Sequence, residues 1–316
     1  MPNQFLMRAR SYLQARRPAF RKDRLFDQLM RLPLTQQETL RTDLFDKVVV
    51  DPAKAARFRA LPMPERRYVL FFTARSGSSR LGDILSRTGV LGQPNEAFNP
   101  GFVPNIAQAY HAADLADYAQ AVLRRRNTQG TFGVEMTYSH MMNLFGSLEE
   151  MIAHLQPTSY LCLIRENLLA QALSLSKLKQ TKVAHSTIAD AERQSAADQA
   201  FRYNPREIMY AMAIYCLAED RLEAKLHRHQ IRPLYLSYEQ TVSLPDAQIL
   251  GAIAGHVGVE LPELPHMPSS HHKLSGSRSA EYAARFAAEH PDFLARMEAH
   301  RAHRLDKLHG FTTTDA

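Results

Sequence analysis

Two short segments of the sequence carry residue types that bind an oxyanion. The first is Ala74-Arg-Ser-Gly-Ser-Ser-Arg80, in which one glycine is flanked by three serines and two arginines. Backbone N–H groups near a glycine, serine hydroxyls and guanidinium groups all donate hydrogen bonds to a phosphate or sulfate. The segment therefore predicts an oxyanion cradle built from Arg75, Ser76, Gly77, Ser78, Ser79 and Arg80. The alternative is a helix start at which a serine only caps the first turn.

The second segment holds the pair Arg165 and Ser174. Arg165 directly follows the apolar run Tyr160–Ile164, and Ser174 lies nine residues later on the polar face of a predicted helix. The fork of a guanidinium fits the oxygens of a phosphate, and serine adds a neutral donor. The pair therefore predicts a phosphomonoester site. The alternative is that Arg165 only forms an ion pair with Glu166 or Glu239.

Strands that alternate with helices must position both segments. Tyr68–Thr73 is a continuous β-branched and aromatic run, which is typical of a strand buried on both faces of a parallel sheet. It leads into the serine-rich loop and then into apolar residues at helical spacing, with Gly89 just past the helix. Further strands are predicted at Thr131–Met136, Tyr160–Ile164 and Arg232–Tyr238, and long helices at 167–180 and 205–229. The alternation predicts a three-layer α/β fold, with a central parallel sheet flanked by helices and a P-loop-like site.

The serine-rich loop differs from the ATP-binding P-loop. That motif is G-x-x-x-x-G-K-[ST], and this chain has neither its first glycine nor its lysine. A P-loop-type NTP-dependent kinase that uses Mg²⁺ is therefore an alternative and not the first choice. The other alternative is a non-catalytic anion-binding protein that works at a membrane or on nucleic acid.

The composition limits the class of protein. The 316 residues carry 39 Lys+Arg against 32 Asp+Glu, a net charge of +7, and 45% are hydrophobic, which is typical of a soluble globular protein. No apolar run reaches the ~18–20 residues of a membrane-spanning helix, and the arginine-rich start lacks the apolar core of a secretory signal, so the expected location is cytoplasmic. The basic residues are spread out and no metal-ligand spacing occurs, so neither a nucleic-acid partner nor a metal is expected.

Taken together, these segments resemble the PAPS-dependent sulfotransferases of the bacterial trehalose 2-sulfotransferase family. The matching stretches are Leu70–Ser79, Thr88–Phe98 and Ile164–Ser174, with a weaker match at Lys273–Tyr282. Arginines and the helical spacing of Leu25, Leu29 and Leu32 predict a basic helical N-terminal extension, residues 1–66, which lies outside the resemblance. The resemblance implies that a sulfotransferase domain, residues 67–316, follows it. It also implies an enzyme that moves a sulfuryl group from 3′-phosphoadenosine 5′-phosphosulfate (PAPS) to a hydroxyl of a carbohydrate or glycolipid acceptor.

The resemblance implies roles for single residues. The stretch from Arg75 to Ser79 would bind the 5′-phosphosulfate, Arg165 with Ser174 the 3′-phosphate, and Lys273 would close over the nucleotide. The glutamate of the family's G-x-P-x-E segment falls on Glu96. A carboxylate can take the proton of an alcohol as the O–S bond forms, so Glu96 is predicted to be the general base and Arg75 the main cation at the leaving phosphate. The alternative for Glu96 is a surface residue in an ordinary Pro-Asn turn.

Two positions depart from the family's pattern. Glu135 stands where the family tends to carry a lysine, and Arg80 stands where an apolar residue is more usual. An inverted charge at Glu135 predicts either a changed acceptor or a replacement cation such as Arg80. Tyr238 and Glu239, which close the last predicted strand, are interpreted as structural. A homodimer and a peripheral membrane contact through residues 1–66 are further partners that the sequence leaves open.

Overall fold

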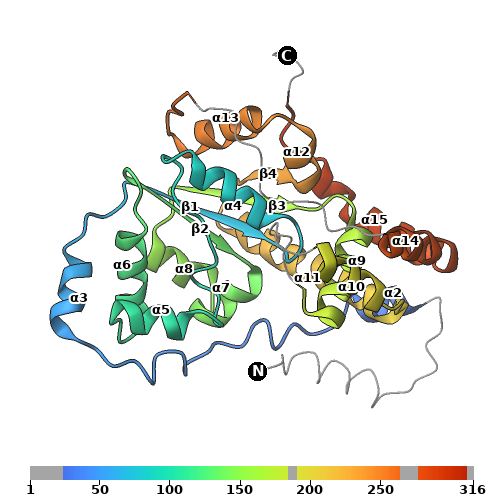
Figure 1. Cartoon of the computed structure of the whole chain (residues 1–316), viewed down its shortest axis with the longest axis horizontal. Helices are drawn as coiled ribbons and strands as arrows, with labels where there is room; N and C mark the ends of the chain where they lie inside the picture. The colour runs from blue at the N-terminus through green and yellow to red at the C-terminus, as the bar shows by residue number, and fades with distance from the viewer. Residues whose placement is uncertain (1–23, 184–190, 264–276, 312–316) are drawn as a thin grey trace.

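A computed structural model describes residues 24–183, 191–263 and 277–311. Within these residues four parallel strands form one sheet in the order β2-β1-β3-β4 (Figure 1). The strands are β1 (Arg66–Phe72), β2 (Thr131–Met136), β3 (Ser159–Ile164) and β4 (Leu234–Ser237). Because the strands are parallel, their carboxyl ends meet at one edge, and the residues that follow β1 and β3 lie side by side there.

Helices cover both faces of the sheet, which confirms the predicted α/β class. Side chains that alternate along β1 point to opposite faces: Tyr68 and Leu70 pack with α4 (Ser78–Arg87) and α13 (Asp246–Val257). Val69 and Phe71 pack on the other face. The helices of that face are α5 (Val103–Tyr110), α6 (Leu115–Arg125), α7 (Tyr138–Phe145), α8 (Leu148–Leu155) and α11 (Pro205–Arg228).

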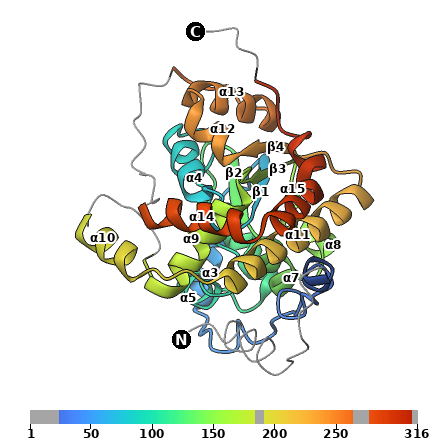
Figure 2. The ribbon, with the colours of Figure 1, turned by 90° about the vertical axis from the view of Figure 1, so that its right-hand side faces the viewer.

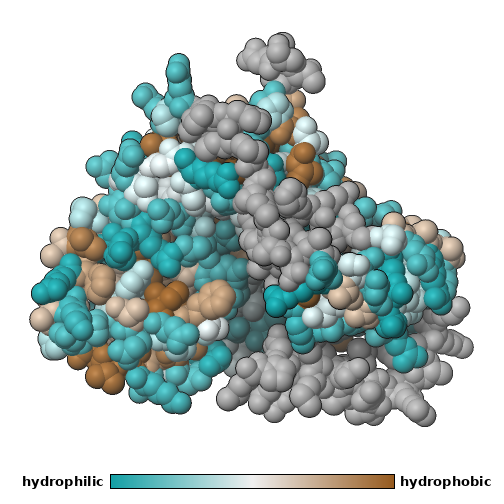
Figure 3. All heavy atoms as spheres, in the orientation of Figure 1, coloured by the Kyte–Doolittle hydropathy of each residue, from teal (hydrophilic) through white to brown (hydrophobic). Residues whose placement is uncertain are grey.

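A separate helical cluster packs beside the sheet. It joins α2 (Leu25–Leu29), α9 (Leu168–Thr181), α11, α14 (Ser277–Glu289) and α15 (Pro291–Leu305). The remaining helices are α3 (Pro52–Arg59), α10 (Ala191–Ala200) and α12 (Tyr238–Ser243). Figure 2 shows α14 and α15 facing the viewer, with α15 beside α11. The face in Figure 3 is largely hydrophilic with apolar side chains interspersed, which is usual for a globular protein.

Local signals in the sequence account for most element boundaries. Asn167 caps α9 by accepting a hydrogen bond from the N–H of Ala170 at 2.8 Å, and Gly89 follows the C-cap of α4 with φ +70°. The last strand is shorter than predicted. Pro233 has no N–H to donate to a strand ladder, and Ser237 caps α12, so that Tyr238 is helical.

The described part of the N-terminal segment packs onto the rest of the chain. Leu34 and Leu44 are buried in the core cluster of the sheet, and the hydroxyl of Tyr138 on α7 donates to Glu38 at 2.6 Å. The expected membrane contact through residues 1–66 depends on an arginine-rich start whose residues 1–23 lie outside the described residues. In the described part of the chain, no helix is both long and apolar enough to cross a membrane.

Gly133 of β2 supplies a testable packing constraint. Its missing side chain makes room for the ring of Tyr68, which is completely buried and donates its hydroxyl to the carbonyl of Leu91 at 2.7 Å. We expect Gly133→Ala to lower the free energy of unfolding by about 1–3 kcal/mol, because the added methyl overlaps that ring. Urea denaturation measures this loss. Gly251→Ala is the control, since nothing lies within 4 Å of its Cβ, and equal stability of the two variants would contradict the prediction.

Candidate active site

The loop between β1 and α4 curls at two left-handed residues. Arg75 has φ +68° and Gly77 has φ +87°, and between them the N–H of Ser76 donates to the carbonyl of Thr73 at 3.1 Å. Residues in this conformation direct successive N–H groups into one concavity, and the first N–H groups of α4 have no partner inside the helix. The positive end of the α4 dipole lies at the same place. The loop therefore has the geometry that an oxyanion cradle requires.

Tyr238, the first residue of α12 after β4, fixes this loop from the side. A Cβ at Gly77 would overlap the ring of Tyr238, so glycine is needed there for space as well as for its positive φ. The same ring lies under the guanidinium of Arg165, whose central carbon is 4.6 Å from the ring centroid. The residue interpreted as structural from the sequence thus touches both predicted anion segments.

The residues of the two predicted anion segments come together in one site. Arg165 Nη1 donates to the carbonyl oxygen of Arg75 at 3.1 Å, and Arg75 Nε donates to Ser174 Oγ at 3.0 Å. Burial lowers the pKa of Arg75, and the like charge of Arg165 acts in the same direction. Two guanidinium groups held this close create a positive potential that favours a multiply charged anion.

Buried polar atoms around the loop also indicate a ligand site. Five of them have no hydrogen-bond partner within the described residues, namely Ser76 Oγ, Arg80 Nη1, Arg165 Nε, Gln171 Oε1 and the hydroxyl of Tyr215. A buried polar group without a partner costs about 1–3 kcal/mol, so a group of them needs an explanation. Burial raises the pKa of Tyr215, and the charges of Arg75 and Arg165 lower it, which places the hydroxyl near both. In the sequence, Tyr215 carries no signal beyond its place in a long predicted helix.

Glu239 is engaged mainly with the backbone and only weakly with Arg165. Its carboxylate accepts from the N–H of Glu166 at 2.9 Å and from the N–H of Asn167 at 3.3 Å, at the start of α9. Arg165 Nε is 3.9 Å from Glu239 Oε1, and Glu166 accepts instead from the hydroxyl of Ser237. The ion-pair alternative for Arg165 is thus limited to one long contact.

Glu96 lies in a segment that runs along the outer edge of β2. The N–H of Glu135 in β2 donates to the carbonyl of Asn95 at 3.0 Å, which fixes the backbone next to Glu96. Asn99 Nδ2 donates to Glu96 Oε2 at 2.7 Å, while 33% of the Glu96 side chain stays exposed. A carboxylate with a fixed backbone and an open face is suited to accept a proton from a bound hydroxyl.

His140, in the first turn of α7, faces Glu96 as a neutral ring. Its Nε2 is 3.9 Å from Glu96 Oε2, and its Nδ1 accepts from the N–H of Thr137 at 3.4 Å. The second contact assigns the ring proton to Nε2. Burial lowers the pKa of His140 to about 4, so at neutral pH the imidazole adds no charge beside Glu96.

Glu135 is buried behind the cradle and not presented to it. Its side chain shares a hydrogen bond with the hydroxyl of Ser78, and its Oε1 fills the place that a Cβ at Gly82 would take. Burial raises the pKa of Glu135 to about 8; the bond to Ser78 lowers it and the nearby Glu96 raises it. Glu135 therefore carries a proton at neutral pH, and the charge inversion expected from the sequence is wrong.

The other predicted residues have different surroundings. Arg80 Nη2 pairs with Asp246 of α13 at 3.1 Å, while its Nη1 is buried without a hydrogen-bond partner within the described residues, so a role of Arg80 as replacement cation stays a prediction. Lys273 lies outside the described residues, while Arg278 Nη1 donates to the carbonyls of Gln199 and Phe201. Within the described ranges no group of three or more His, Cys, Asp or Glu residues is placed to hold a metal ion.

The protonated state of Glu135 predicts a pH dependence of stability. Its pKa is raised from 4.5 to about 8 on folding, so the stability it contributes is complete below about pH 4.5 and is lost as the pH rises towards 8. Glu135→Gln keeps the uncharged form at every pH. We expect its melting temperature to match the unmodified protein near pH 5 and to exceed it by at least about 2 °C near pH 8.5.

The control for this prediction is Glu65→Gln, at a side chain that is 80% exposed. Its melting temperature should follow that of the unmodified protein across the whole pH range. A Glu135→Gln curve that also runs parallel to the unmodified protein would show that Glu135 is ionised in the fold.

Comparison with known proteins identifies the family. The Stf0 sulphotransferase family matches residues 67–289, a range that contains Glu96 and both anion segments. Among solved structures, a sulfotransferase from Alicyclobacillus acidocaldarius is similar to this chain, with 15% sequence identity and a TM-score of 0.42. The similarity covers 76% of this chain and 96% of that chain. At this level of similarity we transfer no residue role from that structure. The comparison with curated proteins gives no match. The family predicted from the motifs is confirmed over most of the chain, and this protein is therefore a sulfotransferase that belongs to the Stf0 family.

Proposed function

We propose that the enzyme transfers a sulfuryl group from PAPS to a hydroxyl of a carbohydrate or glycolipid. The observation that supports this most is the contact between Arg75, Ser174 and Arg165 at the ends of neighbouring strands. PAPS carries anionic groups at the 3′ and 5′ positions of one ribose, so its binding requires two sets of donors a short distance apart. The loop after β1 and the pair Arg165 and Ser174 are the two sets that we propose, and the membership in the sulfotransferase family supports the nucleotide donor.

The donor would lie with its 5′-phosphosulfate at the loop after β1. The N–H groups of Gly77, Ser78 and Ser79, together with Ser76 Oγ, would bind the phosphosulfate oxygens. The hydroxyl of Ser78 is bonded to Glu135, so Ser78 would bind the phosphosulfate through its backbone N–H only. Arg165 and Ser174 would bind the 3′-phosphate, and Lys273 would close over the nucleotide.

The transfer requires one proton acceptor and one stabilised leaving group. The acceptor oxygen forms a bond to sulfur while the bond between sulfur and the 5′-phosphate oxygen breaks, which yields a sulfate ester and adenosine 3′,5′-bisphosphate (PAP). Glu96 takes the proton of the acceptor hydroxyl. Arg75 and the cradle N–H groups stabilise the charge that develops on the leaving phosphate, and they do so from fixed positions.

Nucleotide binding distinguishes this donor from ATP. We expect the protein to bind PAP in EDTA at least about tenfold more tightly than it binds ATP, because ATP has no phosphate for Arg165 and Ser174. Isothermal titration calorimetry measures both affinities. Tight ATP binding that requires Mg²⁺, with weak PAP binding, would contradict the proposed donor and favour a kinase.

The role of Glu96 is tested by turnover. With radiolabelled PAPS and extracts of sugars and glycolipids as acceptors, we expect Glu96→Gln to lose about 10²-fold or more in rate, the usual effect of removing a general base. Its affinity for PAP should stay unchanged, because Glu96 faces the acceptor. Glu65→Gln, at the opposite end of β1, is the control and should keep full activity. An unchanged rate in Glu96→Gln would refute the assignment.

A further inference from the structure

The backbone that carries Arg165 is held by a buried arginine of the last helix. Arg301 of α15 is only 2% exposed, and its Nη1 donates to the carbonyl oxygen of Arg165 at 3.0 Å and to that of Glu166 at 3.4 Å. Its Nε and Nη2 form a two-point pair with the carboxylate of Glu219 on α11, at 2.8 and 3.0 Å. One guanidinium thus connects α15, α11 and the end of β3.

The contacts of Arg301 with the backbone lie just past the end of β3, where the hydrogen bonds of the sheet no longer hold the chain. β3 ends at Ile164, so Arg165 is the first residue past the strand. The direction of its side chain follows from the backbone conformation there, and that side chain must reach the Arg75 carbonyl and the Tyr238 ring. A small rotation of the backbone at Arg165 would move the guanidinium out of both contacts, and misplacement of this kind is costly for binding and catalysis.

The pair between Arg301 and Glu219 is suited to fix a position more than to add stability. Burial lowers the pKa of Arg301, but the charge of Glu219 and its hydrogen bonds outweigh that effect, so the pKa is raised and the guanidinium stays charged. Buried ion pairs add little net stability on average, because desolvation offsets their attraction. The two-point geometry leaves Nη1 directed at the carbonyls of Arg165 and Glu166.

We infer that Arg301 is a positioning residue that orients Arg165 for the 3′-phosphate of the donor. The inference rests on the proposed function, in which Arg165 binds that phosphate. Arg301 lies beyond residues 67–289, the range matched by the family, so the family match assigns it no role. It makes the C-terminal helix α15 part of the support of the nucleotide site.

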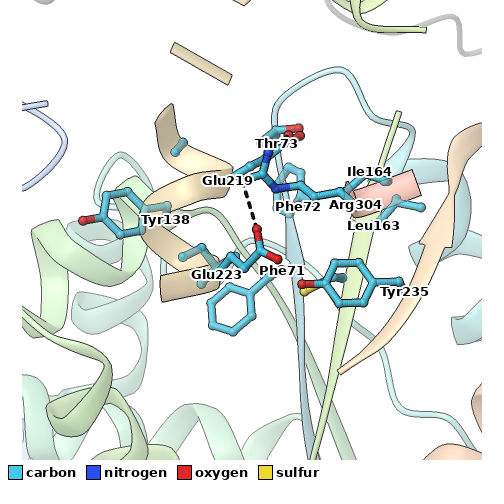
Figure 4. Close-up of a pocket in the computed structure, with 13 residues that line it drawn as sticks. Phe71, Phe72, Thr73, Tyr138, Leu163, Ile164, Glu219, Glu223, Tyr235 and Arg304 are labelled. Carbon is cyan, nitrogen blue, oxygen red and sulfur yellow. Dashed lines mark ion pairs between the residues drawn. The ribbon is translucent and has the colours of Figure 1, made fainter. Parts of the chain in front are cut away.

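Arg304, one turn further along α15, is a matched control. It is equally buried and pairs with the same acidic face of α11, through Glu223 at 3.0 Å and Asp220. Figure 4 shows Arg304 in the pocket between the sheet and α11, next to Glu223 and Glu219. Arg304 donates to the side chain of Asp220, whereas Arg301 Nη1 donates to the backbone carbonyls of Arg165 and Glu166, just past β3.

The test compares two nucleotides that differ only in the 3′-phosphate. Calorimetry on the full chain measures the affinities of PAP and AMP for the unmodified protein, Arg301→Lys and Arg304→Lys. Lysine keeps a charge beside Glu219 but lacks the fork that reaches the carbonyls. We expect Arg301→Lys to weaken PAP binding about tenfold or more and to change AMP binding by less than about twofold. Arg304→Lys should leave the ratio of the two affinities unchanged.

The ratio of the PAP and AMP affinities separates a loss of positioning from a general loss of structure, because damage to the fold weakens the binding of both nucleotides alike. If the unmodified protein binds PAP no more tightly than AMP, the proposed donor site is wrong and this inference falls with it. If it prefers PAP and Arg301→Lys keeps that preference, only the role of Arg301 is wrong.

A second variant keeps the test decisive if Arg301→Lys does not fold. Arg301→Met combined with Glu219→Leu removes both charges, so no buried charge is left without a partner. This double variant should show the same selective loss of PAP affinity. A full preference for PAP in a folded double variant would overturn the inference.

Discussion

Two arginines of like charge are held side by side at the ends of β1 and β3, and much of the surrounding structure serves to keep them there. Arg165 bonds to the carbonyl of Arg75, and Arg75 to Ser174. The Tyr238 ring under Arg165 contributes a cation–π contact, worth about 0.5–2 kcal/mol in such settings, and also requires glycine in the loop. A pair of half-buried cations this close is costly by itself, so the arrangement is suited to a ligand with several negative charges.

Glu96, the proposed base, lies close to two titratable side chains, Glu135 and His140. Part of the Glu96 side chain is exposed, whereas Glu135 is buried and His140 is largely buried. Burial raises the pKa of Glu135 and lowers that of His140, so both neighbours of Glu96 are uncharged at neutral pH. Glu135 also connects the loop after β1 to the segment that carries Glu96. Its side chain bonds to Ser78 at the start of α4, and its N–H donates to the carbonyl of Asn95, next to Glu96.

Local sequence patterns predicted the strands, the helices and the serine-rich loop. They did not predict the features that depend on packing between segments far apart in the sequence. The parallel strands, the helix after Asn167 and the glycine-centred loop follow from apolar periodicity and capping, which act over a few residues. Burial of Glu135 comes from the packing of α4, so its charge was predicted wrongly. Arg301 is 136 residues from Arg165 in sequence, and a bond to a backbone carbonyl requires no particular partner residue that a motif could reveal. Tyr215 was missed because a buried tyrosine in a helix has the same spacing as any apolar residue.

A crystal structure of the protein with PAP would show whether Arg75 and Arg165 serve one nucleotide. We expect the 3′-phosphate within hydrogen-bond distance of Arg165 and Ser174, and the 5′-phosphate against Arg75 and the N–H groups of the loop at Gly77. A nucleotide bound elsewhere, or one with its 3′-phosphate in solvent while Arg165 keeps its present contacts, would contradict this expectation.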